Sequence, residues 1–315
     1  IADSSEPDLT DSSLPQPRLD STVAPDLRLG PPYPIVLAHG FFGFEQIGPL
    51  EYFYKVPDAL RAAGHQVFVT SVDPFNTTYV RGLQLLSQIK DLLAQTGAAK
   101  VNIIGHSQGG LDALFVAAQI PDRIAAIVTI STPHQGTAIA DVLTGDTPGA
   151  LKDLAQAFIS AVAPTAYGDI SDNADIQACL EFLTTASISE FNDAYPLPPG
   201  VAGFSLAGRS LMSRAEDACA TDQPLFAALA DERDPLEPLL SLTGAYLAGS
   251  LLHPEPNDGL VTVASAHWQT WLGCVPADHF DEIGQLLGDS PGPGNSFDYL
   301  QLYLDLADFL VQQGF

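Results

Sequence analysis

The chain has 315 residues, of which 46% are hydrophobic, and its 38 acidic side chains outnumber 12 basic ones to give a formal net charge of −26 at pH 7. A surface this acidic repels phosphate backbones and anionic lipid headgroups, so we expect neither nucleic-acid binding nor electrostatic anchoring to a membrane. No apolar run approaches the roughly 20 residues that span a bilayer, so no transmembrane segment is expected either.

The first segment, residues 1–32, is rich in Pro, Asp and Ser and has no sustained hydrophobic periodicity. Such a segment cannot bury enough apolar surface to offset its ordering entropy. We therefore predict an extended N-terminal arm over 1–32 and one folded domain over 33–315. The chain starts at Ile1 rather than Met, and from this we expect a secreted, extracellular protein whose signal peptide has been removed.

The folded domain opens with a continuous apolar run, Pro34 to Ala38, which is typical of a strand buried on both faces of a parallel sheet. The run ends in a turn, His39-Gly40-Phe41-Phe42-Gly43. A glycine turn in this place can bring a backbone N–H close to a substrate, where it stabilises a negative oxygen. The alternative is a structural glycine turn with a packed phenylalanine.

Helical and strand-like segments then alternate at short spacing. We predict helices at 50–63, 81–96 and 297–313, and strands at 66–72, 101–104, 124–130 and 201–207. This alternation predicts an α/β fold with a mostly parallel central sheet flanked by helices.

The strand at 101–104 leads into Gly105-His106-Ser107-Gln108-Gly109, and an apolar helical segment follows from Leu111 to Ile120. Strand, sharp turn and helix are the setting in which a G-x-S-x-G pattern becomes a nucleophile elbow, with the serine on a strained turn. Side chains at the two glycines would collide with the neighbouring strand and helix. We therefore predict that Ser107 is a nucleophile, the alternative being a structural serine.

Two later segments allow more than one interpretation. His134 follows Ser107 too closely to serve as a base in the chain order Ser, Asp, His, so we interpret it as structural or pocket-lining. Residues 149–164 carry an apolar stripe at helical spacing. We predict a mobile helical lid over about 141–175, with hinges at 141–148 and 165–175, and the alternative is an ordinary surface helix.

A serine hydroxyl needs a base to remove its proton and a third group to orient that base. Ser107, Asp258 and His279 have the order Ser, Asp, His, and Asp258 lies in an Asp-Gly turn. Asp234 is the main rival as the acid, and His253 and His267 are the other downstream histidines.

The three cysteines, Cys179, Cys219 and Cys274, allow one disulfide and one free thiol, and the sequence leaves the pairing open. No pair of them has the spacing of metal ligands, so we expect no metal site from these thiols.

Five blocks resemble a known family when they are taken together. They are Ile35 to Gly43, Gly105 to Leu111, Ser131 to Gly136, Asn257 to Val261 and Asp278 to Gln285. In this order they resemble the secreted bacterial true lipases, the calcium-binding triacylglycerol lipase family I, over most of residues 33–288. The resemblance implies an α/β-hydrolase fold with a helical lid, Ser107 as nucleophile, Asp258 as acid and His279 as base. It also implies an oxyanion hole made by the backbone N–H groups of Phe41 and Gln108.

The resemblance further implies one structural Ca²⁺. Its ligands would be the carboxylates of Asp234 and Asp281 and the main-chain carbonyls of Gln285 and Asp289, oxygen donors of the kind that Ca²⁺ prefers. The alternative is acidic loops that hold no metal. The sequence departs from the family at Ala264, where many members have a cysteine, and in the longer interval between Asp234 and Asp258. Dependence on a dedicated foldase is therefore not carried over.

Together, these features predict an enzyme that cleaves the carboxylic esters of triacylglycerols at a lipid–water interface, contacted through the lid, by way of an acyl-enzyme. One alternative is a short-chain carboxylesterase or a polyester depolymerase. Another is a catalytically silent α/β-hydrolase that serves as a binding module.

Overall fold

The computed structural model describes residues 30–315 apart from 42, 44–45, 48–49, 146–174, 211–217, 224, 236–237, 239, 251–253, 286–290 and 293. The predicted N-terminal arm, except for 30–32, lies outside the described residues. So do the predicted lid helix at 149–164 and the hinge at 165–174.

Within the described residues, six strands form one parallel sheet in the order β4-β1-β5-β6-β7-β8. The strands are β1 (Ile35–Ala38), β4 (Val67–Val69), β5 (Val101–His106), β6 (Ile124–Ile130), β7 (Ala202–Gly208) and β8 (Thr270–Val275). Two further short strands, β2 (Gln46–Ile47) and β3 (Leu50–Glu51), pair with each other in antiparallel fashion. The predicted α/β fold with a parallel sheet is confirmed.

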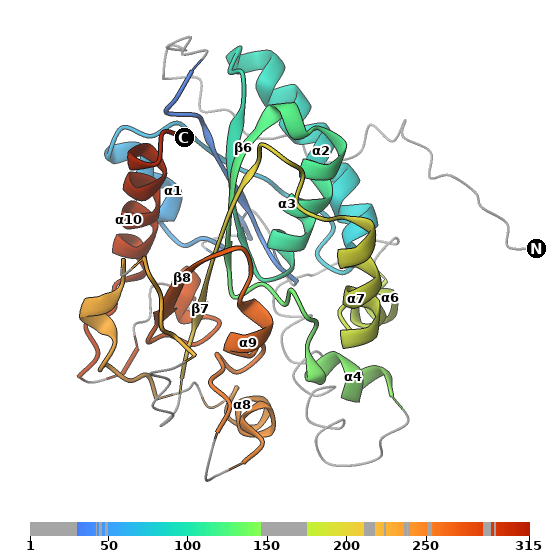
Figure 1. Ribbon diagram of the computed structural model, residues 1–315, viewed down its shortest axis with the longest axis vertical. Coiled ribbons are helices and arrows are strands. Elements are labelled where there is room, and N and C mark those ends of the chain that lie inside the picture. The colour runs from blue at the N-terminus through green and yellow to red at the C-terminus, as the bar shows by residue number, and fades with distance from the viewer. Residues whose placement is uncertain are drawn as a thin grey trace, which may run out of the picture.

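Helices cover both faces of this sheet (Figure 1). The α-helices are α1 (Val56–Ala62), α2 (Thr78–Thr96), α3 (Gln108–Gln119), α4 (Ala138–Thr144), α6 (Ile176–Phe182), α7 (Thr185–Ala194), α8 (Ser241–Ala248), α9 (Val263–Ala266) and α10 (Tyr299–Gln312). Short 3₁₀ turns are η1 (Pro121–Arg123), η2 (Ala227–Leu229) and η3 (Asp281–Ile283). Among the described helices, none is long and apolar enough to cross a membrane.

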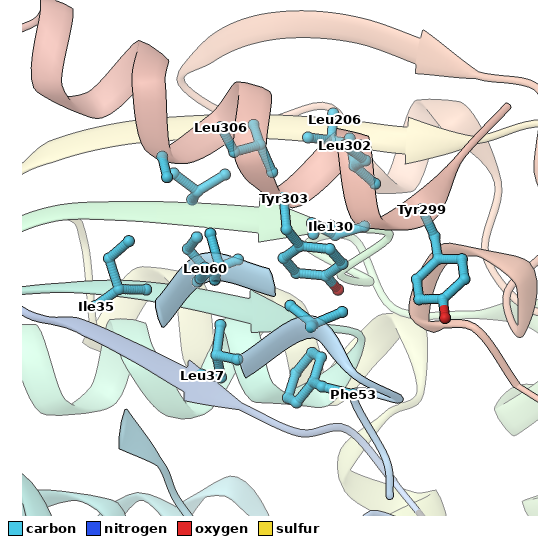
Figure 2. Packing of buried hydrophobic residues seen from close by; sticks show 14 of the residues in the cluster. Ile35, Leu37, Phe53, Leu60, Ile130, Leu206, Tyr299, Leu302, Tyr303 and Leu306 are labelled. Atoms are coloured by element: carbon cyan, nitrogen blue, oxygen red, sulfur yellow. The ribbon is translucent and has the colours of Figure 1, made fainter. Parts of the chain in front are cut away.

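The central strands are buried on both faces, and successive side chains along them point alternately into two separate hydrophobic cores. Ile35 and Leu37 of β1 pack with α1 and α10, whereas Val36 and Ala38 pack with α2 and α3. Figure 2 shows the first core, in which Tyr303 of α10 lies over the sheet. Two buried faces explain why these strands have continuous apolar sequences.

Two predicted elements need correction. The predicted helix at 50–63 is shorter, because residues 50–51 pair in β3 and α1 begins only at Val56, followed at once by the proline that suits a helix start. The predicted hinge at 141–148 is wrong for residues 141–144, which belong to α4. Thr137 caps that helix by accepting a hydrogen bond from the Ile139 N–H.

Candidate active site

The turn between β5 and α3 holds Ser107 in a strained backbone conformation. Its φ of 55° and ψ of −130° lie outside the usual regions for a residue with a side chain. A Cβ on Gly105 would lie 2.6 Å from the Gly110 nitrogen, and a Cβ on Gly109 would overlap the carbonyl of Ala38. The two glycines therefore allow strand and helix to meet closely at Ser107, as the sequence predicts.

The turn after β1 lies directly against this serine. A Cβ on Gly40 would come within 2.6 Å of the Ser107 Cβ, so only glycine fits there. The Val72 N–H donates to His39 Nε2 at 3.1 Å, so His39 carries its proton on Nδ1 and donates it to the Gly40 carbonyl at 2.9 Å. Burial lowers the pKa of His39 to about 3, so this ring is neutral. The two hydrogen bonds of the buried His39 ring therefore fix the turn that carries Phe41.

A buried arginine connects this turn to the helix of the elbow. Arg81 of α2 donates to the His39 carbonyl at 2.6 Å and to the Asp73 carbonyl at 2.7 Å. It also pairs with Asp112 of α3 at 2.8 Å, with both side chains almost fully buried. Burial raises the pKa of Asp112, although Arg81 opposes the shift. Arg81 fixes the His39 to Phe41 turn relative to α3, a role that the sequence analysis missed.

Gln108 is the first residue of α3, and the first amides of a helix have no partner within the helix. Its backbone N–H is therefore suited to bind a negative oxygen, an interaction that the helix dipole favours. Its side chain is turned elsewhere: Nε2 donates to the Asn76 carbonyl at 2.9 Å, and Oε1 accepts from the Cys179 thiol at 3.4 Å.

Asp258 and His279 form a buried pair. His279 Nδ1 lies 2.7 Å from Asp258 Oδ2, and the other oxygen, Oδ1, accepts the N–H groups of Leu260 and Val261 at 2.8 and 2.7 Å. An ionised carboxylate only accepts, so Nδ1 carries the proton and Nε2 is left as an acceptor. The ring of His279 also lies 4.5 Å from that of His106, the residue before Ser107. The structure thus brings Ser107, Asp258 and His279 to one region.

The alternative acid and bases have other partners or lie outside the described residues. Asp234 accepts the Ser210 hydroxyl at 2.5 Å and belongs to an acidic group with Asp278 and Asp281, whereas His279 Nδ1 contacts Asp258. His267 is exposed and contacts Trp271, while His253 lies outside the described residues. His134 is buried and stacked on Trp268 at 4.6 Å, and burial lowers its pKa to about 3, in keeping with a structural role.

The predicted metal ligands are only partly described. The carboxylates of Asp234 and Asp281 approach each other, and the structure adds Asp278, so that one oxygen from each lies within 4.8 Å of the others. All three side chains are buried. Gln285 donates through Nε2 to the carbonyls of Glu51 and Tyr52, so its side chain is already engaged. Asp289 lies outside the described residues.

A second set of buried polar residues, which the sequence analysis missed, lies behind His279. Glu282 contacts His106 at 3.0 Å and accepts the Ser131 hydroxyl at 2.6 Å, and Tyr52 contacts the other ring nitrogen of His106 at 2.7 Å. Burial and the neighbouring Asp258 carboxylate raise the pKa of Glu282 well above its ordinary value. Burial and His279 lower the pKa of His106. The only signal in the sequence is proximity, because His106 and Glu282 flank the predicted catalytic residues.

The cysteine pairing that the sequence leaves open is Cys219 with Cys274, a residue of β8. Cys179 is free and buried in α6, and burial raises the pKa of its thiol to about 12. A thiol with such a pKa is unreactive near neutral pH.

Comparisons with known proteins agree on fold and family. A family model described as the alpha/beta hydrolase fold matches residues 33–273. The chain is 37% identical over 272 residues to a triacylglycerol lipase of Vibrio cholerae, and this match covers 81% of each chain. It is 33% identical over 294 residues to a triacylglycerol lipase of Pseudomonas fragi, covering 90% of this chain and 97% of the relative.

Solved structures resemble the fold at lower sequence identity. EstA from Clostridium botulinum gives a TM-score of 0.63 at 18% identity and covers 94% of this chain and 90% of its own. The lipase of Staphylococcus hyicus gives 0.60 at 19% identity, with coverages of 89% and 95%. At these identities the likeness concerns the fold.

Proposed function

The chain belongs to the alpha/beta hydrolase family, among the triacylglycerol lipases, and from this premise we propose that it cleaves triacylglycerol esters with Ser107 as nucleophile, His279 as base and Asp258 as acid. The observation that carries the proposal is the 2.7 Å contact between His279 Nδ1 and Asp258 Oδ2. Such a contact leaves Nε2 of the same ring as a base. The ring of His279 also packs against His106, the residue that precedes Ser107.

The chemistry proceeds in two steps. His279 Nε2 takes the Ser107 proton as Oγ attacks the ester carbonyl, and then gives that proton to the departing alcohol. Water attacks the acyl-enzyme in the second step, again with His279 as base, and the fatty acid leaves. Asp258 holds the ring in the required tautomer and stabilises its positive form. Atoms balance as ester plus water to acid plus alcohol.

The oxyanion hole in this proposal consists of the backbone N–H groups of Phe41 and Gln108. The close packing of Gly40 on Ser107 supports the first donor, because it sets the Phe41 turn directly beside the nucleophile. The position of Gln108 at the start of α3 supports the second. One such donor contributes roughly 2.7–4 kcal/mol to transition-state stabilisation in comparable sites.

A structural Ca²⁺ is the next part of the proposal. The donor set fits this ion, because three buried carboxylates converge and Ca²⁺ takes six to eight hard oxygen ligands. Asp234, Asp281 and the Gln285 carbonyl would hold it, with Asp289 as predicted and Asp278 as an added oxygen donor. A bound cation would offset the repulsion among these carboxylates and tie Asp234 to the segment that carries His279.

Action at a lipid–water interface and secretion complete the proposal. The names of the relatives support a water-insoluble substrate. The Cys219–Cys274 disulfide supports export, because disulfides persist in oxidising compartments.

The proposal is tested by titrating the fatty acid released from emulsified trioctanoin and from tributyrin below and above its solubility limit. Ser107→Ala serves as the control. An interfacial lipase gains activity sharply when droplets form and loses it in the variant. Activity confined to dissolved short esters would instead identify a carboxylesterase, and no release from any ester would overturn the enzymatic proposal.

A further inference from the structure

A buried hydrogen-bond network next to His279 connects four parts of the fold. Tyr52 follows β3, His106 ends β5, Ser131 follows β6, and Glu282 belongs to η3. His106 uses both ring nitrogens, with Nδ1 at 2.7 Å from Tyr52 Oη and Nε2 at 3.0 Å from Glu282 Oε2. The second oxygen of Glu282 accepts from Ser131, whose Oγ in turn accepts the Gly208 N–H at 3.0 Å.

This network contacts three parts of the proposed catalytic site: the base, the turn of the nucleophile and the turn at Gly40. The His106 ring packs against the His279 ring at 4.5 Å, and His106 is bonded to Ser107 through the peptide chain. Tyr52 Oη lies close to Gly40, since a Cβ there would be 2.8 Å from it. A distance of at most 4.8 Å separates any two of three atoms: one ring nitrogen of His106, one ring nitrogen of His279 and one carboxylate oxygen of Glu282. The network therefore supports one side of the His279 ring through its contact with His106.

The hydrogens of this network can be arranged in two ways. If the Tyr52 hydroxyl donates to His106 Nδ1, a neutral His106 ring carries its proton on Nε2 and donates it to Glu282 Oε2. If Tyr52 Oη instead accepts from His106 Nδ1, then Nε2 accepts from a protonated Glu282, and an amide NH₂ in its place could donate in the same way. In both arrangements Ser131 donates to the other oxygen of residue 282. Glu282 is completely buried, so each of these partners would lose its hydrogen bond to protein without gaining one to water if Glu282 were removed.

We propose that Glu282 is a positioning residue that fixes the His106 ring, and through it His279, by hydrogen bonds rather than by its negative charge. The inference rests on the proposed function, in which His279 is the base. Glu282 does not touch the reacting atoms. An uncharged side chain of the same shape that keeps these hydrogen bonds therefore suffices.

Two variants separate hydrogen bonding from charge and volume. Glu282→Gln keeps the shape and an amide that can bridge His106 and Ser131 without charge, whereas Glu282→Met keeps most of the volume without these bonds. Hydrolysis of dissolved p-nitrophenyl butyrate is measured with calcium present, together with circular dichroism and thermal unfolding. Glu190→Gln, on the exposed surface of α7, is the matched control.

We expect Glu282→Met to lower kcat by roughly 10- to 100-fold with KM within about twofold, since a displaced base impairs the chemical step rather than binding. Glu282→Gln should restore kcat to within about threefold of the wild type, as a bridging amide keeps the ring in place. Tyr52→Phe, which loses only Oη, should show the same pattern as the Met variant more weakly, and it decides the question if the Met variant does not fold.

Equal kcat in the wild type, Glu282→Met and Tyr52→Phe would overturn the positioning role. Equal loss in the Gln and Met variants would overturn the claim that charge is dispensable. A wild type that hydrolyses no ester would instead contradict the proposed function, so the two failures are distinguishable.

Discussion

Asp258→Asn offers a sharp test of how the base is oriented. In the wild type, Oδ1 is fixed by the N–H groups of Leu260 and Val261 at 2.8 and 2.7 Å, and Oδ2 faces His279 Nδ1. The asparagine oxygen will stay with the two N–H donors, because the amide nitrogen cannot accept from them. The NH₂ group then faces Nδ1 of His279 and forces that atom to become an acceptor.

The consequence is a histidine in the wrong tautomer, with a proton on Nε2 and no base for Ser107. Where this substitution leaves the geometry of a serine triad intact, kcat falls by about 10⁴. That factor corresponds to about 5.4 kcal/mol of transition-state stabilisation, at about 1.36 kcal/mol for each tenfold. The side chains are isosteric, so we expect little change in the thermal midpoint.

The assay is steady-state hydrolysis of dissolved p-nitrophenyl butyrate, with Asp231→Asn as a control at an exposed acid. We expect a large loss in kcat and a small change in KM for Asp258→Asn. A kcat within tenfold of the wild type would refute the assignment of Asp258 as the group that sets the tautomer of His279.

Three further predictions concern stability. Arg81→Met leaves the buried Asp112 carboxylate and the His39 carbonyl without their partner. Urea denaturation should therefore show a loss of about 3–5 kcal/mol in the free energy of unfolding, and the double variant Arg81→Met with Asp112→Leu should recover much of it. A loss below about 1 kcal/mol would contradict the role of this pair. Chelation by EDTA should lower the thermal midpoint of the wild type but not that of Asp281→Ala, and a midpoint insensitive to EDTA would count against the calcium site. His39 and His134 have pKa values of about 3 in the folded chain and of 6.5 in the unfolded chain. As the pH falls from 6.5 towards 3, the unfolded chain therefore binds more protons than the folded chain, and stability is lost over that window. For two groups, the free energy of unfolding changes by at most about 2.7 kcal/mol per pH unit. His134→Phe should reduce that slope in urea denaturation series between pH 4 and 6.5, and an unchanged slope would argue against the buried neutral state.

Sequence patterns predicted the centre of the sheet well, for a physical reason. The strands β1, β5 and β6 are buried on both faces, so an apolar run marks them clearly. The strand β8 escaped notice because Thr270–Val275 contains a glycine and starts at an exposed threonine. The short helix α9 was missed as well, since four residues are too few to show periodicity.

The candidate site was predictable where chemistry dictates residue type and spacing. Gly105, Ser107 and Gly109 follow from the steric demands of the elbow, and the relatives confirm the family resemblance drawn from the separate blocks. The roles of Ser107, Asp258 and His279 in catalysis stay predictions.

Supporting residues were not predictable, because long-range packing alone gives them their partners. Arg81 and Asp112 are 31 positions apart in sequence, and His106 and Glu282 are 176 apart. No local pattern marks such pairs. The disulfide pairing is similar, since the approach of Cys219 to Cys274 depends on the course of the chain beside β8.

The central claim is that Ser107 is the nucleophile activated by His279. Its most direct test is labelling of the wild type and of Ser107→Ala and His279→Ala with a fluorophosphonate, followed by peptide mass spectrometry. We expect one adduct on Ser107 in the wild type, none in Ser107→Ala and a strongly slowed reaction in His279→Ala. An adduct on another residue, or none in the folded wild type, would contradict it.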